Sequence, residues 1–229
     1  MMRVFLLVLM LFWSTLGHSK TAFLDKKRTV EIIDNIDMNS LGLADKIESL
    51  ARRSDKPIYL MINSLGGSVL VGNTIIDALH VAQARGVEIR CAVGVYAMSM
   101  AFNILSQCDK RWVLKNTKLL FHPARIHSRE PFTAEMLVEA ARDLEAIEED
   151  GQYQLIRAMR VAKSWFRYHY NRETQWEAKH LDNEVQNFLT IVDDIRGTDK
   201  LFITERADNF FGLLFGSKRA YEVIRIWQP

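Results

Sequence analysis

The order of apolar and polar positions divides the chain into short strands and longer helices. An apolar run from Ile58 to Ile62 lies between a Lys-Pro pair and an Asn-Ser pair, which is typical of a buried strand that ends in a tight turn. Gly66 and Gly67 follow, and apolar residues at helical spacing then predict a helix over 68–84. A strand, a glycine turn and a helix in this order can present backbone N–H groups to negative charge.

The same patterns predict further elements on both sides of this strand. Strands alternate with helices, which predicts an α/β domain built of repeated strand-strand-helix or strand-helix units. The remaining predicted strands are Thr29–Ile33, Val87–Val93, Trp112–Leu114 and Leu119–Phe121. The remaining predicted helices are one that begins after Ser40, one from Gly94 to Gln107, a long arm over 133–161, and one that contains Trp176 and Leu181.

Both ends of the chain differ from this middle part. A basic start, an apolar run from Val4 to Trp13 and small residues before Lys20 predict a secretory signal over residues 1–19, with an uncleaved membrane anchor as the alternative. The apolar tail over 198–229 is expected to pack on the domain or, alternatively, to contact a subunit or a membrane surface. We expect a secreted or periplasmic protein with one main domain over residues 28–197.

Composition narrows the classes of function. The 229 residues are 48% hydrophobic and carry a net charge of +2, which suits a globular domain with a sizeable core and gives no basis for nucleic-acid binding. The histidines show no ligand spacing with cysteines or carboxylates, so we expect no metal site and no cofactor. Cys91 and Cys108 are the two cysteines, and we expect two buried thiols, with a disulfide between them as the alternative.

Two residues have the types needed for nucleophilic hydrolysis. Ser99 lies at the start of a predicted buried helix after a strand, and His122 ends a strand 23 residues later. Hydrolysis through an acyl-enzyme needs a nucleophile, a base, an orienting group and an oxyanion hole. A buried serine at a helix start is also a common cap or packing residue, so the pair alone is a weak signal.

Three blocks of sequence in the right order resemble the proteolytic subunit of the Clp protease (ClpP), within the ClpP/crotonase superfamily. They are residues 58–72, the Ser99-Met-Ala segment with Lys110-Arg111 and Asn116, and Leu119-Leu-Phe-His-Pro123. The resemblance covers roughly residues 28–197 and implies a repeated β-β-α spiral with a long protruding helix. It also implies a serine peptidase that acts on peptides or unfolded protein and assembles into a homo-oligomeric ring.

By this resemblance Ser99 is the nucleophile and His122 the general base, and the amides of Gly67 and Met100 form the oxyanion hole. Gly94 stands one residue farther from Ser99 than the family pattern has it, so an ungapped alignment places Met98 at the nucleophile position. We favour Ser99, because a methionine cannot attack a carbonyl.

The third member of the triad is less well defined by the resemblance. Counting from the two flanking motifs leads to Glu173 or to Asn171. We choose Glu173, because a carboxylate can both orient the imidazole and stabilise the imidazolium.

Two other functions remain open at this point. One is a catalytically silent scaffold that keeps the fold for oligomerisation or peptide binding. The other, weaker one is an acyl-coenzyme A enzyme of the crotonase group, which also uses paired backbone amides.

Overall fold

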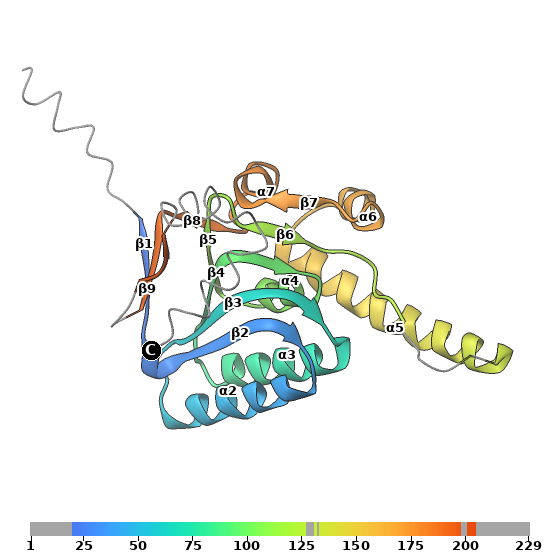
Figure 1. Ribbon diagram of the computed structural model, residues 1–229, viewed down its shortest axis with the longest axis horizontal. Coiled ribbons are helices and arrows are strands. Elements are labelled where there is room, and N and C mark those ends of the chain that lie inside the picture. Colours follow the sequence, from blue (N-terminus) through green and yellow to red (C-terminus); the bar gives the residue numbers. More distant parts are fainter. Residues whose placement is uncertain (1–19, 127–130, 132, 198–200, 205–229) are drawn as a thin grey trace, which may run out of the picture.

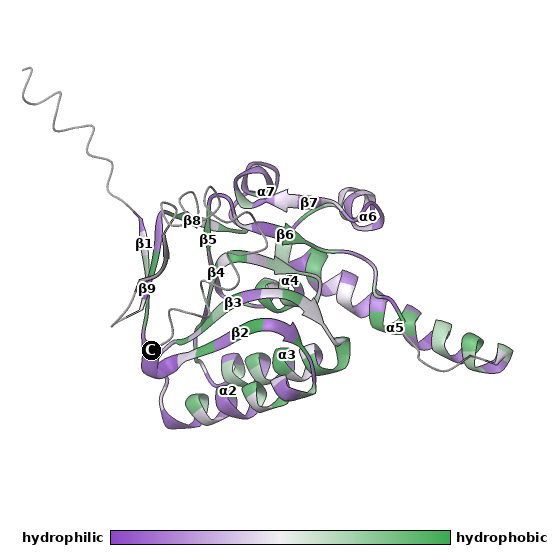
Figure 2. Cartoon of the chain, in the orientation of Figure 1, coloured by the Kyte–Doolittle hydropathy of each residue, from purple (hydrophilic) through white to green (hydrophobic). Residues whose placement is uncertain are grey.

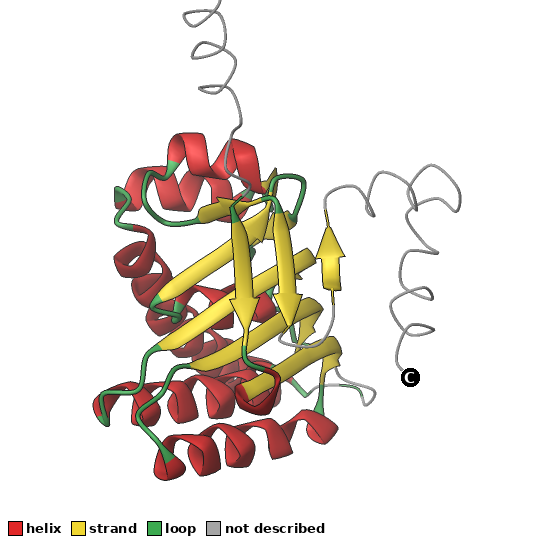
Figure 3. Ribbon diagram, turned by 90° about the vertical axis from the view of Figure 1, so that its left-hand side faces the viewer, coloured by secondary structure: helices red, strands yellow, loops and turns green. Residues whose placement is uncertain are grey.

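A computed structural model describes residues 20–126, 131, 133–197 and 201–204 of the protein. A large twisted sheet forms the centre, helices cover one of its faces, and a small sheet lies across the other (Figures 1 and 3). The α/β class and the ClpP-like fold expected from the sequence are therefore confirmed. The bounds of the strands are β1 Thr21–Leu24, β2 Thr29–Ile36, β3 Ile58–Gly67, β4 Ile89–Met98, β5 Lys110–Leu114, β6 Lys118–Leu120, β7 Gln175–Glu177, β8 Thr190–Val192, β9 Asp194–Gly197 and β10 Leu201–Thr204.

The large sheet is mainly parallel. Its strands follow the order β2-β3-β4-β5-β8, and β6 continues the sheet beside the second half of β4 and pairs antiparallel with β7. The small sheet has the order β1-β9-β10, so the folded part includes a strand that precedes residue 28. In parallel sheets the carboxyl ends of neighbouring strands meet at one edge, and loops at that edge commonly carry the binding site.

Alternate residues of the central strands face two different cores. On β3, Leu60 and Ile62 pack against the helices, whereas Met61 packs toward the small sheet. On β4, Cys91 likewise packs against the helices and Ala92 toward the small sheet. Both faces of the strand are thus buried, which explains the continuous apolar run that marked β3 in the sequence.

The helices are α2 Leu41–Arg53, α3 Val69–Ala84, α4 Met100–Ser106, α5 Ala134–Met159, α6 Lys163–Asn171 and α7 Ala178–Glu184, with two 3₁₀ turns at Lys26–Arg28 and Met38–Ser40. The hydroxyl of Thr133 accepts a hydrogen bond from Met136 N and caps α5, which projects from the body (Figure 1). Its buried residues, Leu155 and Met159, lie near its carboxyl end. Apolar and polar positions mix along its outer part (Figure 2).

Two sequence predictions of local structure are wrong. The chain stays in β4 past Gly94 as far as Met98, so the helix begins at Met100 and not at Gly94. Trp176 lies in β7, where it pairs with Leu119, and the helix begins at Ala178. In both cases pairing with β6 keeps the chain extended.

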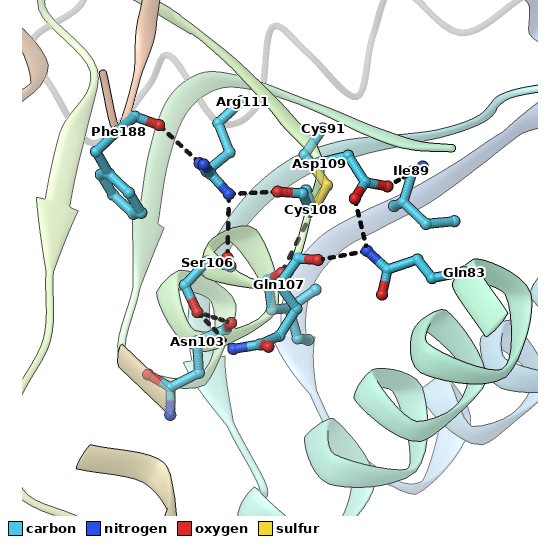
Figure 4. The surroundings of a disulfide bond; sticks show 11 residues. Gln83, Ile89, Cys91, Asn103, Ser106, Gln107, Cys108, Asp109, Arg111 and Phe188 are labelled. Atoms are coloured by element: carbon cyan, nitrogen blue, oxygen red, sulfur yellow. Dashed lines mark hydrogen bonds between the residues drawn. A yellow bond between two sulfur atoms is a disulfide. The ribbon is translucent and has the colours of Figure 1, made fainter. Parts of the chain in front are cut away.

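Cys91 of β4 and Cys108 after α4 form a disulfide (Figure 4), so the expectation of two thiols is wrong. Helix α4 doubles back along β4 and brings the two Cα atoms to 5.9 Å, within the range that a disulfide spans. Arg111 of β5 donates hydrogen bonds to the carbonyls of Ser106, Cys108 and Phe188 and so binds the carboxyl end of α4.

The predicted signal over 1–19 and nearly all of the tail over 198–229 lie outside the described residues. Within the described part of the chain, no helix has the length and apolar character needed to cross a bilayer.

Candidate active site

Ser99 occupies a sharp turn between β4 and α4. Its backbone angles are φ 54° and ψ −125°, a conformation that residues other than glycine rarely adopt. A strained serine between a strand and a helix exposes its hydroxyl in the manner of a nucleophile elbow. The helix that follows is buried and begins directly at Met100.

Strand pairing joins this turn to His122. Met98 is in register with Leu120 in the parallel pair β4–β6, and Ser99 N donates to Leu120 O at 2.8 Å. His122 comes two residues after Leu120, at the same edge of the sheet. The two candidate catalytic residues are therefore brought together because their strands are neighbours and end at the same level.

The pairing of β4 with β3 is irregular in the segment that leads to Ser99. Ile62 is paired with Val93, but Ser64 is paired with Ala97, so β4 uses four residues where β3 uses two. Two backbone groups of this bulge bind side chains: Asn63 Oδ1 accepts from Val95 N at 2.7 Å, and the Thr117 hydroxyl donates to Gly94 O at 2.8 Å. The strand continues through this bulge as far as Met98, so Ser99 rather than Met98 stands at the turn.

Gly66 provides the close approach of the β3–α3 turn to Ser99. Its φ is +98°, and a Cβ placed on it would stand 2.6 Å from Ser99 Cβ and 2.9 Å from Met100 N. Gly67, with φ +148°, lies against the backbone of Ile36, with which it is paired between β2 and β3. Sequence reasoning selected Gly67 for the oxyanion hole and did not single out the contact that Gly66 makes.

Met100 supplies the first N–H of α4, a position that has no acceptor within the helix. Its side chain lies against Gly72 of α3, where a Cβ would collide with it. This packing fixes the start of α4 against α3, so the Met100 amide stays beside Ser99.

Ser99 and His122 line one cavity between α3, α4, α5 and the segment after β6. Among the described residues, its other lining positions are Val69, Asn73, Ile76, Met100, Asn103, Gln107, Ala124, Ile147, Glu148, Asp150, Gly151, Gln154, Leu155 and Tyr170. No group of three or more potential ligand side chains that could hold a metal ion occurs in the described part of the chain.

The imidazole of His122 is oriented by the backbone. Its Nδ1 lies 2.6 Å from Pro123 O, and because a carbonyl can only accept, the proton belongs on Nδ1. Nε2 then keeps its lone pair and can accept a proton from a nucleophile. Ser99 Oγ forms no hydrogen bond with any described residue, and such contacts commonly tighten only when substrate is bound.

A family model described as Clp protease matches residues 17–179, well over half of the chain. The chain belongs to the Clp protease family. The ATP-dependent Clp protease proteolytic subunits 3 of Synechococcus sp. (strain CC9605), Synechococcus sp. (strain CC9902) and Parasynechococcus marenigrum (strain WH8102) are each 34% identical to it over 111 residues, which are 48% of this chain and 52% of each relative. The chain thus matches about half the length of these curated relatives.

In this member of the Clp protease family, Glu173 lies apart from the cavity. It follows α6 in a left-handed conformation with φ 51°, and its carboxylate forms an ion pair with Arg125. Asn171 ends α6 with an exposed side chain and does not line the cavity either. The structure thus brings Ser99 and His122 together and leaves both candidates for the third triad position outside the cavity.

Glu148 of α5 is a residue of the cavity that sequence reasoning missed as a functional candidate. Its Oε1 accepts from Ala124 N at 2.6 Å, which ties α5 to the segment that carries His122. Burial, and then the charge and hydrogen bond of Glu148, raise the pKa of Tyr170. The only signal in the sequence was an acid on the apolar stripe of α5, and that signal does not tell which residues it meets.

Proposed function

We propose that the protein is a serine peptidase in which Ser99 attacks a peptide carbonyl and His122 Nε2 takes the proton. The observation that carries this proposal is that Ser99 and His122 line the same cavity. Ser99 lies at a strained strand-to-helix turn, and the Nδ1 of His122 is hydrogen-bonded to Pro123 O. Membership of the Clp protease family supports the same reaction.

The acyl-enzyme pathway also needs stabilisation of the oxyanion. The Met100 amide, at the start of α4 beside the nucleophile, is one proposed donor, and the Gly67 amide in the adjoining glycine turn is the other. The role of Glu173 as the orienting carboxylate remains a prediction. In the structure the Nδ1 of His122 is hydrogen-bonded to Pro123 O, and Glu173 forms an ion pair with Arg125.

We also propose that the chain is exported to the periplasm or secreted. The Cys91–Cys108 disulfide supports this proposal, because disulfides persist in oxidising compartments and are rare in the cytosol. Peptides or already unfolded segments are then the expected substrates. Assembly into a homo-oligomer is a further expectation, supported by the family and by the projecting α5.

Labelling with a fluorophosphonate serine probe, followed by peptide mapping, tests the peptidase proposal. We expect a covalent adduct on Ser99 that is abolished in Ser99→Ala and His122→Ala. Ser106→Ala is the matched control, because Ser106 lies on the same helix α4 but does not line the cavity. A folded and assembled protein that acquires no adduct would favour the catalytically silent scaffold instead.

A further inference from the structure

The cavity that holds Ser99 and His122 has an acidic wall on α5. Glu148 and Asp150 both line it, and no lysine or arginine appears among its described lining residues. These carboxylates therefore face the same space as the proposed nucleophile.

Both carboxylates keep capacity for a positively charged ligand. Glu148 accepts from Ala124 N at 2.6 Å, and burial, followed by the charge of Glu148, raises the pKa of the nearby Tyr170 phenol. Asp150 Oδ2 accepts from Gln154 Nε2 at 2.7 Å. Each carboxylate can accept about four hydrogen bonds, so these contacts do not saturate either group. Neither acid forms an ion pair with a basic residue of the described part of the chain.

Gly151 leaves free room beside the two acids. It lies in the interior of α5 and lines the cavity, and a Cβ placed on it would have nothing within 4 Å. No neighbouring atom therefore requires a glycine here, although glycine in a helix costs about 1 kcal/mol relative to alanine. A consequence of the missing side chain is that a ligand can lie directly along the helix.

We propose that this wall selects peptides with a lysine or arginine next to the cleaved bond. The inference rests on the proposed peptidase function and names its substrate class. The aliphatic stem of the basic side chain runs along Gly151 and the apolar side chain of Leu155, and its charged end meets Glu148 and Asp150.

Peptidyl diphenyl phosphonates test this specificity directly. The Ser99 oxygen displaces one phenoxide from phosphorus, and the hydroxyl proton leaves through His122. The probes carry a lysine-type, a norleucine-type or a glutamate-type side chain beside the phosphorus, and norleucine matches the lysine stem without its charge. We expect the lysine probe to inactivate the assembled protein at least about tenfold faster than the norleucine probe.

Two variants connect this preference to the wall. Asp150→Asn is expected to reduce the ratio of lysine to norleucine rates, and Glu149→Gln is its matched control, because Glu149 is a neighbouring exposed acid of α5 that does not line the cavity. Gly151→Leu, checked for folding by circular dichroism, is expected to slow both long-chain probes.

The outcomes separate the inference from the peptidase proposal. If Ser99 is labelled but norleucine reacts as fast as lysine, the specificity is overturned and the peptidase proposal stands. An equal change in Asp150→Asn and Glu149→Gln also overturns it. If no probe, the plain fluorophosphonate included, labels Ser99 in folded protein, the peptidase proposal and the inference both fail.

Discussion

Gly66 and Ser99 approach so closely that a Cβ on Gly66 would stand 2.6 Å from the Cβ of Ser99. Gly66→Ala should therefore displace the Ser99 turn, and its positive φ adds strain. We expect a loss of about 2 kcal/mol of unfolding free energy and at least about tenfold slower labelling of Ser99. Urea unfolding and the rate of fluorophosphonate labelling measure the two effects.

Gly42→Ala is the control for this substitution. Gly42 lies in α2, and a Cβ there has nothing within 4 Å, so alanine should stabilise the helix by up to about 1 kcal/mol. Equal labelling rates in Gly66→Ala and wild-type protein would show that the contact has no part in positioning the nucleophile.

The disulfide is expected to contribute substantially to stability. Cys91 and Cys108 are 17 residues apart, and closing a loop of this size stabilises a protein by about 3 kcal/mol. The double variant Cys91→Ala/Cys108→Ala should lose about that much in urea unfolding, and dithiothreitol should destabilise the wild-type protein but not the variant. Detection of two free thiols in unreduced, denatured protein would contradict the bond itself.

Asn63 should stabilise the bulge of β4. Its side chain is buried and accepts the Val95 N–H, so Asn63→Ala leaves this partly buried donor without its partner, at a cost of about 1–3 kcal/mol. Slower labelling of Ser99 should accompany the loss, because the bulge positions the turn. Asn39→Ala, at an exposed position, should change stability by less than about 0.5 kcal/mol. If Asn63→Ala is as stable as the wild-type protein, another group must accept the hydrogen bond of the Val95 N–H.

Glu173→Gln measures what this carboxylate does for catalysis. Since Glu173 pairs with Arg125 and Pro123 O holds His122, we expect less than about a tenfold fall in kcat for a peptide substrate. A triad carboxylate that orients the base is worth on the order of 10⁴ in kcat. A loss of that size in a correctly folded variant would show that Glu173 moves to His122 in the working enzyme.

Acid should weaken the contact between β6 and β7. Hydrogen bonds from Lys118, and then Lys179, lower the pKa of Glu177 to about 2. Because this value lies below the unfolded value of about 4.3, the stabilisation is complete above that pH and is lost as the pH falls towards 2. The difference in stability between wild type and Glu177→Gln should therefore vanish over this range in a urea series at different pH values. A difference that stays constant down to pH 2 would contradict it.

Much of the scaffold around the site could be predicted because its signals are local. The apolar run of β3, the glycine turn and the periodic residues of α3 lie within one stretch of chain, and Thr133 marked the start of α5. These signals come from side chains a few residues apart in the sequence, so they do not depend on how the rest of the chain folds.

The missed features depend on partners far along the chain. Gly94 reads as the end of a strand, but Thr117, 23 residues later, satisfies the bulge that lets β4 continue. Trp176 reads as part of a helix until β6 is available to pair with it. The proximity of Cys91 to Cys108 likewise follows from how α4 folds back along β4.

The candidate site also contains some residues that the sequence could predict and others that it could not. Ser99 and His122 could be proposed from motif and order, and the structure brings them into one cavity. Glu148 could not, because its role depends on α5 meeting the segment after β6. Glu173 came from counting along the chain, which does not show that Arg125 pairs with it.

The bond between Cys91 and Cys108 also makes the proposed nucleophile part of a closed covalent ring. If the protein is pulled from its two ends, the residues inside that ring cannot be drawn out until the bond is reduced. At about 3.5 Å per residue, the pulled chain is therefore roughly 60 Å shorter than it would be without the bond. A cut within the ring would leave two fragments still joined, so the strand and the helix on either side of Ser99 remain attached to each other.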